Sequence, residues 1–230
     1  MLRRILTFMR SYGFAATAKH AFDKAYKGLI PPLRQVYCAY LADFVSLETT
    51  GEPLITVQAF PSFDKIPPGV LEDLFSNGTI DNKKPHSRAG VAAFLSWLFS
   101  RGAEMWACTE NGILVGYLWA LSGSRDATRY HFFPLSSRDA VFLAHEVFPP
   151  YRGRQLNRRM TYIVLGEMKG RGIERVFVDV EISNERSLKS FSKTPFKPIG
   201  QARMKDLKRR QFVVWMRQTA SDSTNPDPRS

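Results

Sequence analysis

The fold is decided by residues 147–157, which read VFPPYRGRQLN. This stretch follows an apolar, strand-like run at 140–148 and precedes a helical pattern that extends to about Lys169. A basic, glycine-containing loop at a helix N-terminus is typical of phosphate binding, because backbone N–H groups there lack partners and the helix dipole favours an anion. Arg152 and Arg154 add two guanidinium groups at the same place. The sequence therefore predicts an anion site between this strand and this helix.

A second group of residues follows the loop at spacings that match a known pattern. Residues 171–173 read RGI and residues 176–180 read VFVDV. The matching positions beyond them are Asn184, Ser187, Leu188, Phe191, Lys193 and Phe196. Together with the loop, residues 139–200 resemble the GNAT superfamily of N-acyltransferases, and the upstream hairpin ILVGY at 113–117 resembles the family's two central strands.

The resemblance implies an α/β fold with a mixed, mostly antiparallel sheet, splayed parallel central strands and helices on both faces. The splayed strands would be residues 140–148 and 175–180. We expect a basic amphipathic N-terminal extension at 1–50, a GNAT-like acyltransferase domain at 51–217 and a disordered tail at 218–230. Apolar patterns further predict strands at 35–44, 54–60, 105–108, 113–121 and 211–216, and helices at 70–75, 88–101, 155–169 and 184–193.

The resemblance also implies acetyl-CoA as a cosubstrate, held where the two parallel strands separate, and no metal. Its pyrophosphate would take the backbone N–H groups from Arg154 to Asn157, and Arg152 would add charge. The N–H of Val147 would face the thioester oxygen and stabilise the tetrahedral oxyanion. The side chain of Asn184 would bond the pantetheine arm, cap the helix that it begins, or do both. The implied cofactor-binding residues are Val147, Arg152, Gly153, Arg154, Gln155, Leu156, Asn157 and Asn184.

Three positions depart from the family pattern. Gln155 and Asn157 stand where the loop usually has small residues, and we expect both to keep helical dihedrals so that their N–H groups stay available. Phe191 stands where many members have a tyrosine that acts as general acid, and Pro195 replaces a glycine. A leaving thiolate would then depart as such or take a proton from water, since a free thiol has a pKa of about 8.5.

The acceptor amine must lose a proton before it attacks, so the site needs a general base. Glu146 and His145 lie at the expected splay point, and His131 precedes the same strand. Neighbouring strand residues face opposite sides of a sheet, so we expect only one of Glu146 and His145 to point at the substrate. A histidine base predicts a rate that rises near pH 6.5, whereas a carboxylate base predicts a rise nearer pH 5.

The net charge of +12 is concentrated in the two flanks of the chain. Residues 1–40 and residues 197–217 each carry seven Lys or Arg and one Asp, whereas residues 41–196 carry 18 basic and 17 acidic side chains. A neutral middle argues against a nucleic-acid enzyme, so no specific nucleic-acid partner is expected. Hydrophobic residues make up 44% of the chain, which excludes wholesale disorder, and two cysteines do not make a disulfide framework. We therefore expect a cytoplasmic protein.

Residues 2–28 have a helical pattern with an apolar stripe and scattered basic residues. Such a helix packs on its own domain or lies on an anionic membrane surface, and the sequence leaves both interpretations open. Weak peripheral contact with the inner face of the membrane and a homodimer are further expectations. No apolar run approaches the roughly 18 residues of a spanning helix, and Arg10 interrupts the start too early for a signal peptide.

The leading hypothesis is transfer of an acetyl or other acyl group from coenzyme A to a primary amine by direct attack in a ternary complex. The acceptor would be a small molecule or an envelope precursor such as an amino sugar. The alternatives are a non-catalytic coenzyme A-binding module with a GNAT-like fold, a protein N-acetyltransferase, and a nucleic-acid-associated protein that uses the two basic flanks.

Overall fold

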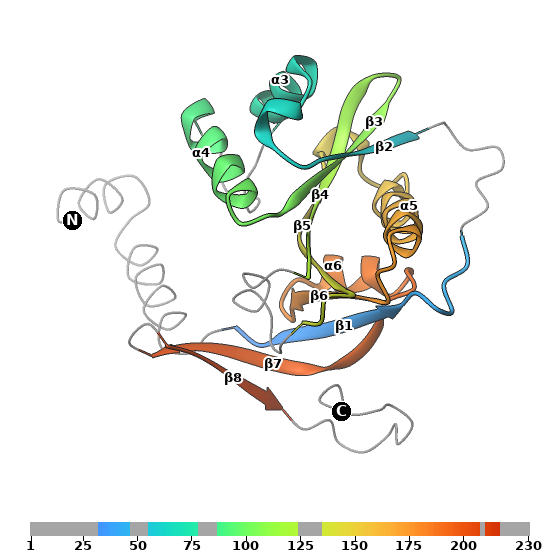
Figure 1. The fold of residues 1–230 in the computed structure, drawn as a ribbon, viewed down its shortest axis with the longest axis vertical. Helices are drawn as coiled ribbons and strands as arrows, with labels where there is room; N and C mark the ends of the chain where they lie inside the picture. Colours follow the sequence, from blue (N-terminus) through green and yellow to red (C-terminus); the bar gives the residue numbers. More distant parts are fainter. Residues whose placement is uncertain (1–31, 47–54, 78–86, 124–134, 208–209, 217–230) are drawn as a thin grey trace, which may run out of the picture.

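The computed structural model describes residues 32–46, 55–77, 87–123, 135–207 and 210–216. Its strands form one mixed sheet in the order β2-β3-β4-β5-β6-β1-β7-β8 (Figure 1). The strands are β1 (Arg34–Tyr40), β2 (Ile55–Phe60), β3 (Glu104–Glu110), β4 (Ile113–Ser122), β5 (Asp139–Val147), β6 (Arg175–Glu181), β7 (Lys197–Leu207) and β8 (Arg210–Met216). Among these strands only β5 and β6 pair in parallel, as the resemblance implied.

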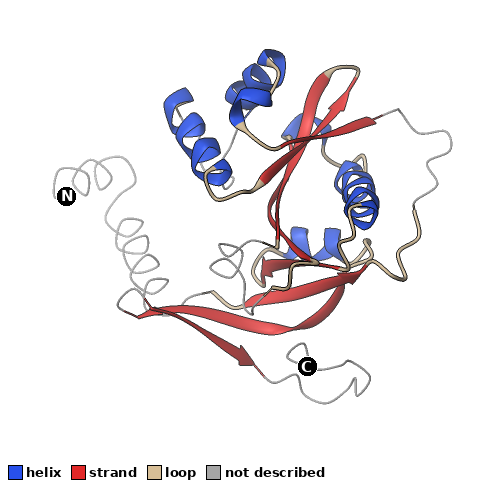
Figure 2. Ribbon diagram, in the orientation of Figure 1, coloured by secondary structure: helices blue, strands red, loops and turns tan. Residues whose placement is uncertain are grey.

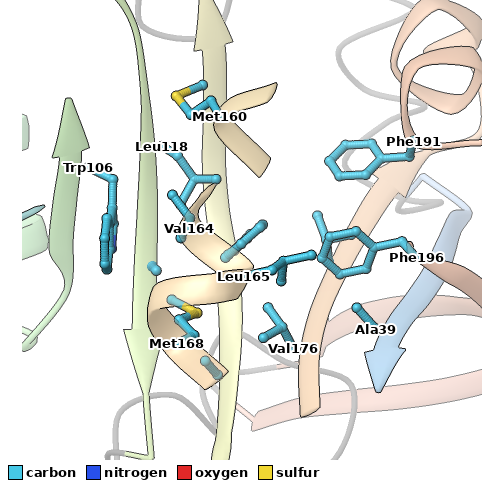
Figure 3. Packing of buried hydrophobic residues seen from close by; sticks show 14 of the residues in the cluster. Ala39, Trp106, Leu118, Met160, Val164, Leu165, Met168, Val176, Phe191 and Phe196 are labelled. Carbon is cyan, nitrogen blue, oxygen red and sulfur yellow. The ribbon is translucent and has the colours of Figure 1, made fainter. Parts of the chain in front are cut away.

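The described α-helices cover both faces of the sheet (Figure 2). They are α3 (Pro68–Asn77), α4 (Arg88–Phe99), α5 (Leu156–Gly170) and α6 (Glu185–Phe191). The buried residues of α3 and α4 join one hydrophobic cluster, and those of α5 and α6 join a second cluster on the other face. In the second cluster, Met160, Val164, Leu165 and Met168 of α5 lie between Leu118 and Trp106 on one side and Val176 and Phe196 on the other (Figure 3). The α/β fold with helices on both faces is therefore confirmed.

The two parallel strands separate halfway along β5. Pairing between β5 and β6 runs from Asp139–Arg175 to Phe142–Val178 and ends there. On its other side β5 stays paired with β4 as far as Val147–Gly116. The β4 register shifts between Trp119 and Ala120, which leaves Leu143 without a partner and forms a β-bulge. The bulge and the splay coincide.

The strand β1 corrects the expected domain boundary. It lies between β6 and β7 and pairs antiparallel with both, so residues 34–40 belong to the sheet and not to an N-terminal extension that ends at residue 50. Val36 and Cys38 are buried in one cluster, and Tyr37 and Ala39 in the other. A strand buried on both faces is an inner strand of the domain.

Most other predicted elements are present, with ends displaced by a few residues. The strand expected at 35–44 ends at Tyr40, and β7 was not predicted, because Pro198 and the charged residues at 203–206 obscure its pattern. The N-terminal helix at 2–28 and the tail at 218–230 lie outside the described residues. No helix within the described ranges is long and apolar enough to cross a membrane.

A buried ion pair fastens the beginning of the parallel pair. Nε and Nη2 of Arg175 donate to the two carboxylate oxygens of Asp139 at 2.8 and 3.0 Å, and the Ser136 N–H donates at 2.7 Å. Asp139 is 1% exposed. Burial alone would raise the pKa of Asp139, but the hydrogen bonds from Arg175 and Ser136 outweigh it and hold the pKa below its ordinary value.

We expect Asp139→Asn to lower the free energy of unfolding by about 3 kcal/mol, because Arg175 loses its buried partner. In the native chain the stabilisation from Asp139 is complete above the unfolded pKa of about 3.9 and is lost as the pH falls through the lower folded pKa. Urea unfolding at several pH values measures both effects. The matched control is Glu174→Gln, which removes the exposed pair with Arg138 and should cost less than about 1 kcal/mol. An equal loss of unfolding free energy in the two variants would contradict the conclusion that the Asp139–Arg175 pair fastens β5 to β6.

Candidate active site

A cleft of about 570 Å³ opens where β5 leaves β6. It is lined by residues 143–147 of β5, by residues 151–153 and Gln155 of the loop, by the first turn of α5, and by one side of α6 with the turn that follows it. Its charged lining residues are the acidic Glu146 and the basic Arg152, Arg158, Arg186, Lys189 and Lys193. The neutral middle of the sequence thus forms a cationic cleft, which suits an anionic ligand.

Three basic residues, two in α6 and one in the turn after it, were not predicted as site residues. Arg186, Lys189 and Lys193 are exposed and form no ion pair with any other described residue. Arg186 and Lys189 are three residues apart and Lys193 is four further on, a spacing that places them on one side of a helix. That spacing is the signal by which the sequence indicates them.

The loop presents a row of free backbone donors. The first backbone bond of α5 runs from the Arg159 N–H to the Gln155 carbonyl at 3.1 Å. The N–H groups from Gly153 through Arg158 have no acceptor within the described part of the chain. Unpaired N–H groups at the start of a 15-residue helix are what the predicted phosphate site requires. Leu156 contributes its N–H alone, since its side chain is buried in the core.

Gln155 does not keep the helical dihedrals that were expected. It is the N-cap of α5 with φ 56° and ψ 14°, which is left-handed, and its side chain makes no capping bond. Glycine takes this conformation without steric cost, whereas another residue pays about 1 kcal/mol. Asn157 is helical as expected, and its Nδ2 donates to the Ser190 hydroxyl of α6 across the cleft.

Protein carboxylates and carbonyls engage the two loop arginines. Arg152 turns back onto β5, where its Nε donates to the Val147 carbonyl at 2.8 Å and its Nη2 lies 3.6 Å from the Glu146 carboxylate. Arg154 pairs with Glu110 at the end of β3 and does not line the cleft. Arg152 lines the cleft while it makes these contacts, whereas Arg154 points to β3. Their role in anion binding stays a prediction.

The end of β5 presents backbone N–H groups to the splay. The Phe148 N–H donates to the Val115 carbonyl at 3.0 Å, so the preceding Val147–Gly116 pair is a non-hydrogen-bonded pair of the β4–β5 ladder. The Val147 N–H therefore faces away from β4 and into the cleft, as expected. By the same alternation the N–H of His145, two residues earlier on β5, also faces the cleft. This donor was not predicted, although the alternation of N–H directions along a strand indicates it.

Glu146 and His145 lie on opposite faces of β5. The Glu146 carboxylate accepts from the Tyr117 hydroxyl at 2.8 Å, and Tyr117 belongs to the cluster under α3 and α4. The His145 ring packs edge-on against Phe142 and Phe191 of the other cluster, with centroids 6.4 and 6.0 Å apart. Both residues nevertheless line the cleft.

Burial lowers the pKa of His145 to about 3, so its imidazole is neutral at pH 7 and a weak base. A rise in rate near pH 6.5 is therefore no longer expected from it. The third candidate base, His131, lies outside the described residues.

Asn184 acts at least as a helix cap. Its Oδ1 accepts from the Ser187 N–H at 3.2 Å at the start of α6. Asn184 is exposed and lines the cleft, so its amide group stays available to a ligand. No cluster of His, Cys, Asp and Glu within the described ranges could hold a metal ion.

Comparison with known proteins agrees with this geometry. Residues 71–194, more than half of the chain, match the model of the Acetyltransferase (GNAT) family, and the chain belongs to that family. Membership supports acyltransferase activity and the use of a coenzyme A thioester. No curated protein sequence matches the chain.

Several solved structures share the fold at low sequence identity. A tandem GNAT protein from the clavulanic acid biosynthesis pathway is 12% identical with a TM-score of 0.52, over 80% of this chain and 51% of that chain. A GNAT acetyltransferase from Colwellia psychrerythraea is 11% identical with a TM-score of 0.51, over 81% and 56%. A glucosamine N-acetyltransferase region of a fungal multi-domain GH3 beta-N-acetylglucosaminidase is 16% identical with a TM-score of 0.54, over 82% and 22%. The chain thus spans about half or less of these proteins.

The left-handed Gln155 gives a direct test of the loop geometry. We expect Gln155→Gly to raise the free energy of unfolding by about 0.5–1 kcal/mol, because glycine adopts φ 56° without strain. Gln155→Ala is the control, since alanine carries the same strain and should bring no gain. Chemical denaturation measures both. A glycine variant no more stable than the alanine variant would show that residue 155 is not left-handed.

The buried imidazole predicts a loss of stability in acid. Between about pH 6.5 and pH 3 the unfolded chain binds a proton at His145 and the folded chain does not, so the free energy of unfolding falls with decreasing pH by up to about 1.4 kcal/mol per pH unit. We expect His145→Phe and His145→Gln, which cannot titrate, to flatten the profile between about pH 6.5 and 4. Parallel profiles for the native chain and both variants would refute the buried neutral state.

Proposed function

We propose that this chain transfers an acetyl, or another acyl, group from coenzyme A to a primary amine by direct attack in a ternary complex. The observation that carries the proposal is the unpaired edge of β5, which lies beside a row of free N–H groups in a cationic cleft. Such an edge can pair with an extended, amide-containing ligand like an added strand. The pantetheine arm of coenzyme A has that chemistry.

The residues present fit coenzyme A along the whole cleft. The N–H groups from Gly153 to Arg158 would hold the pyrophosphate, and Arg186, Lys189 and Lys193 supply further positive charge. The amide of Asn184 would bond the pantetheine. The N–H groups of Val147 and His145 face the place where a thioester oxygen would lie, so one of them would stabilise the oxyanion.

Glu146 is our candidate for the general base. It borders the cleft, its carboxylate is held by the Tyr117 hydroxyl and lies near Arg152, and its side chain is 12% exposed. The Tyr117 hydroxyl and Arg152 hold the carboxylate at the edge of the cleft, where an incoming amine would meet it. His145, neutral and with a pKa of about 3, is the weaker candidate.

The acceptor that we propose is a small amine or an envelope precursor, with an amino sugar as the first choice. One protein of similar fold is described as a glucosamine N-acetyltransferase region, which supports that choice. We also propose a cytoplasmic location, with weak contact at the inner face of the membrane through the basic N-terminal segment. A protein amine is an acceptor of the same chemistry.

A second function, binding of coenzyme A without turnover, is favoured by three particular residues. Gln155 makes the loop strained, the Asn157–Ser190 hydrogen bond crosses the cleft, and Phe191 supplies no hydroxyl. A module of this kind would bind coenzyme A and release no thiol from acetyl-CoA. The same binding and turnover experiments separate it from the enzyme.

Calorimetry with acetyl-CoA and thiol release with a panel of amines test the proposal. We expect binding, thiol release with at least one amine, and a rate that falls roughly 100-fold in Glu146→Gln with unchanged affinity for acetyl-CoA. Glutamine keeps the shape and the bond to Tyr117 but takes up no proton. The matched control Glu110→Gln, which lies outside the cleft, should leave the rate nearly unchanged.

Absence of binding would overturn the proposal altogether. Binding without thiol release for any amine would support the non-catalytic module. An unchanged rate in Glu146→Gln would remove Glu146 as the base and leave the acyl transfer itself standing.

A further inference from the structure

We propose that the side chain of His145 is a catalytic residue that donates a hydrogen bond to the leaving sulfur of the thioester. This inference rests on the proposed acyl transfer and assigns His145 a role other than proton removal. The imidazole of His145 lines the cleft and has no hydrogen-bond partner among the described residues.

Both ring nitrogens of His145 are buried and have no hydrogen-bond partner among the described residues. The ring is held between the edges of Phe142 and Phe191, which offer no acceptor. A buried polar group without a partner is costly, and native proteins keep few of them. An unpaired imidazole that borders a cleft therefore indicates that a ligand supplies the missing partner.

The position of the ring selects the part of the ligand. His145 lies on β5 two residues before Val147, and the backbone N–H groups of both residues face the cleft. The ring lies on the α6 side of the strand, whereas Glu146 lies on the other face with Tyr117. The proposal therefore places the thioester oxygen on these N–H groups, the amine on the Glu146 side of the strand, and the sulfur on the side of the imidazole. The torsion of a histidine ring about χ2 is broad, so a small rotation presents an N–H to the cleft.

The two tyrosines that line the cleft are less suited to this position. The Tyr117 hydroxyl donates to Glu146 on the opposite face. Tyr151 lies beyond the end of β5, next to the phosphate loop. Phe191, which packs against the imidazole from α6, carries no hydroxyl.

The chemistry requires a donor and no change of charge on the ring. The amine nitrogen bonds to the thioester carbon, and the carbonyl electron pair moves to oxygen, where the backbone N–H groups hold it. When the carbonyl re-forms, the carbon–sulfur bond breaks and its electron pair goes to sulfur. Glu146 takes the proton that the nitrogen loses and passes it to water. The neutral imidazole keeps its proton and shares it with the thiolate in a hydrogen bond. The thiolate takes a proton from water when it leaves. A pKa of about 3 keeps the ring neutral throughout the physiological range, so the donor is always present.

Two variants of the full chain distinguish this role from packing. His145→Phe keeps an aromatic ring and removes the donor, whereas His145→Gln loses the ring and keeps an N–H donor. We expect kcat with acetyl-CoA to fall roughly tenfold or more in His145→Phe with little change in KM, and to be largely retained in His145→Gln. Unfolding of both variants is measured alongside. Retained activity in His145→Phe, or a greater loss in His145→Gln, would overturn the proposal.

A second readout needs no turnover. The probe is coenzyme A itself, whose bound thiol is titrated by the far-ultraviolet absorbance of the thiolate. A donor beside the sulfur lowers the pKa of the bound thiol, so we expect a lower value for the native chain and His145→Gln than for His145→Phe. The protein's own two cysteines do not interfere, because burial raises the pKa of Cys38 and of Cys108 to about 12.

The other titratable groups near the ring are the same in all three proteins. They are Glu146 on β5, Lys189 on α6, Lys193 in the turn after α6, and Tyr37 on β1 behind Phe191. Equal thiol pKa values in the three proteins would therefore overturn the role of His145 even if acyl transfer is confirmed. A shifted pKa without any thiol release would support the contact and count against the proposed activity. Failure to bind coenzyme A would overturn both.

Discussion

The parallel pairing between β5 and β6 lasts for the residue pairs Asp139–Arg175 to Phe142–Val178, and the whole site depends on its ending there. Pairing that continued to the end of β5 would occupy the N–H groups of His145 and Val147 that face the cleft. The bulge at Leu143 ends the pairing by placing Leu143 and Ala144 both against the cluster under α3 and α4. An unpaired inner edge is ordinarily a liability, and here α5 and α6 cover it on one side. The cleft thus arises from an interruption of the strand pairing that the two helices cover on one face.

Each end of the splay is fastened by a different contact. At the closed end the buried Asp139–Arg175 pair joins the two strands. At the open end β4 holds β5, and Gly116 lets them approach closely, since a Cβ there would lie 2.5 Å from the Glu146 carbonyl oxygen. Arg152 then ties the Val147 carbonyl to the loop. Between the ends, α5 fills the wedge with side chains that touch both strands (Figure 3). The edge is therefore rigid while its N–H groups stay free, which is the preorganisation that oxyanion stabilisation needs.

Local patterns predicted the loop, α5, the β3–β4 hairpin and the strands of the splay, because their signals lie within a few residues of one another. The place of β1 was not predictable in this way, since it pairs with β6 across about 140 residues of chain. The features of the site likewise divide into those that local patterns predict and those that depend on distant residues. The N–H groups of Val147 and of the loop follow from alternation and helix geometry, whereas the partners of Arg152 and Arg154 depend on where Glu146 and Glu110 arrive in the folded chain. The dihedral angles of Gln155 departed from the expectation, and nothing in its local sequence indicates the left-handed conformation.

Residues 41–196 are nearly neutral, yet they form a cationic cleft because of where their charges pair. Several of the acidic residues pair with arginines away from the cleft, as in Arg88–Glu72, Arg138–Glu174 and Arg171–Glu104. These pairs cancel charge locally and contribute little field at a distance. Arg186, Lys189 and Lys193 have no such partner within the described ranges, so they set the potential over the cleft. The net charge of a sequence segment is therefore a poor predictor of the charge of its ligand. The potential over a site depends on which charged side chains the fold leaves without a partner.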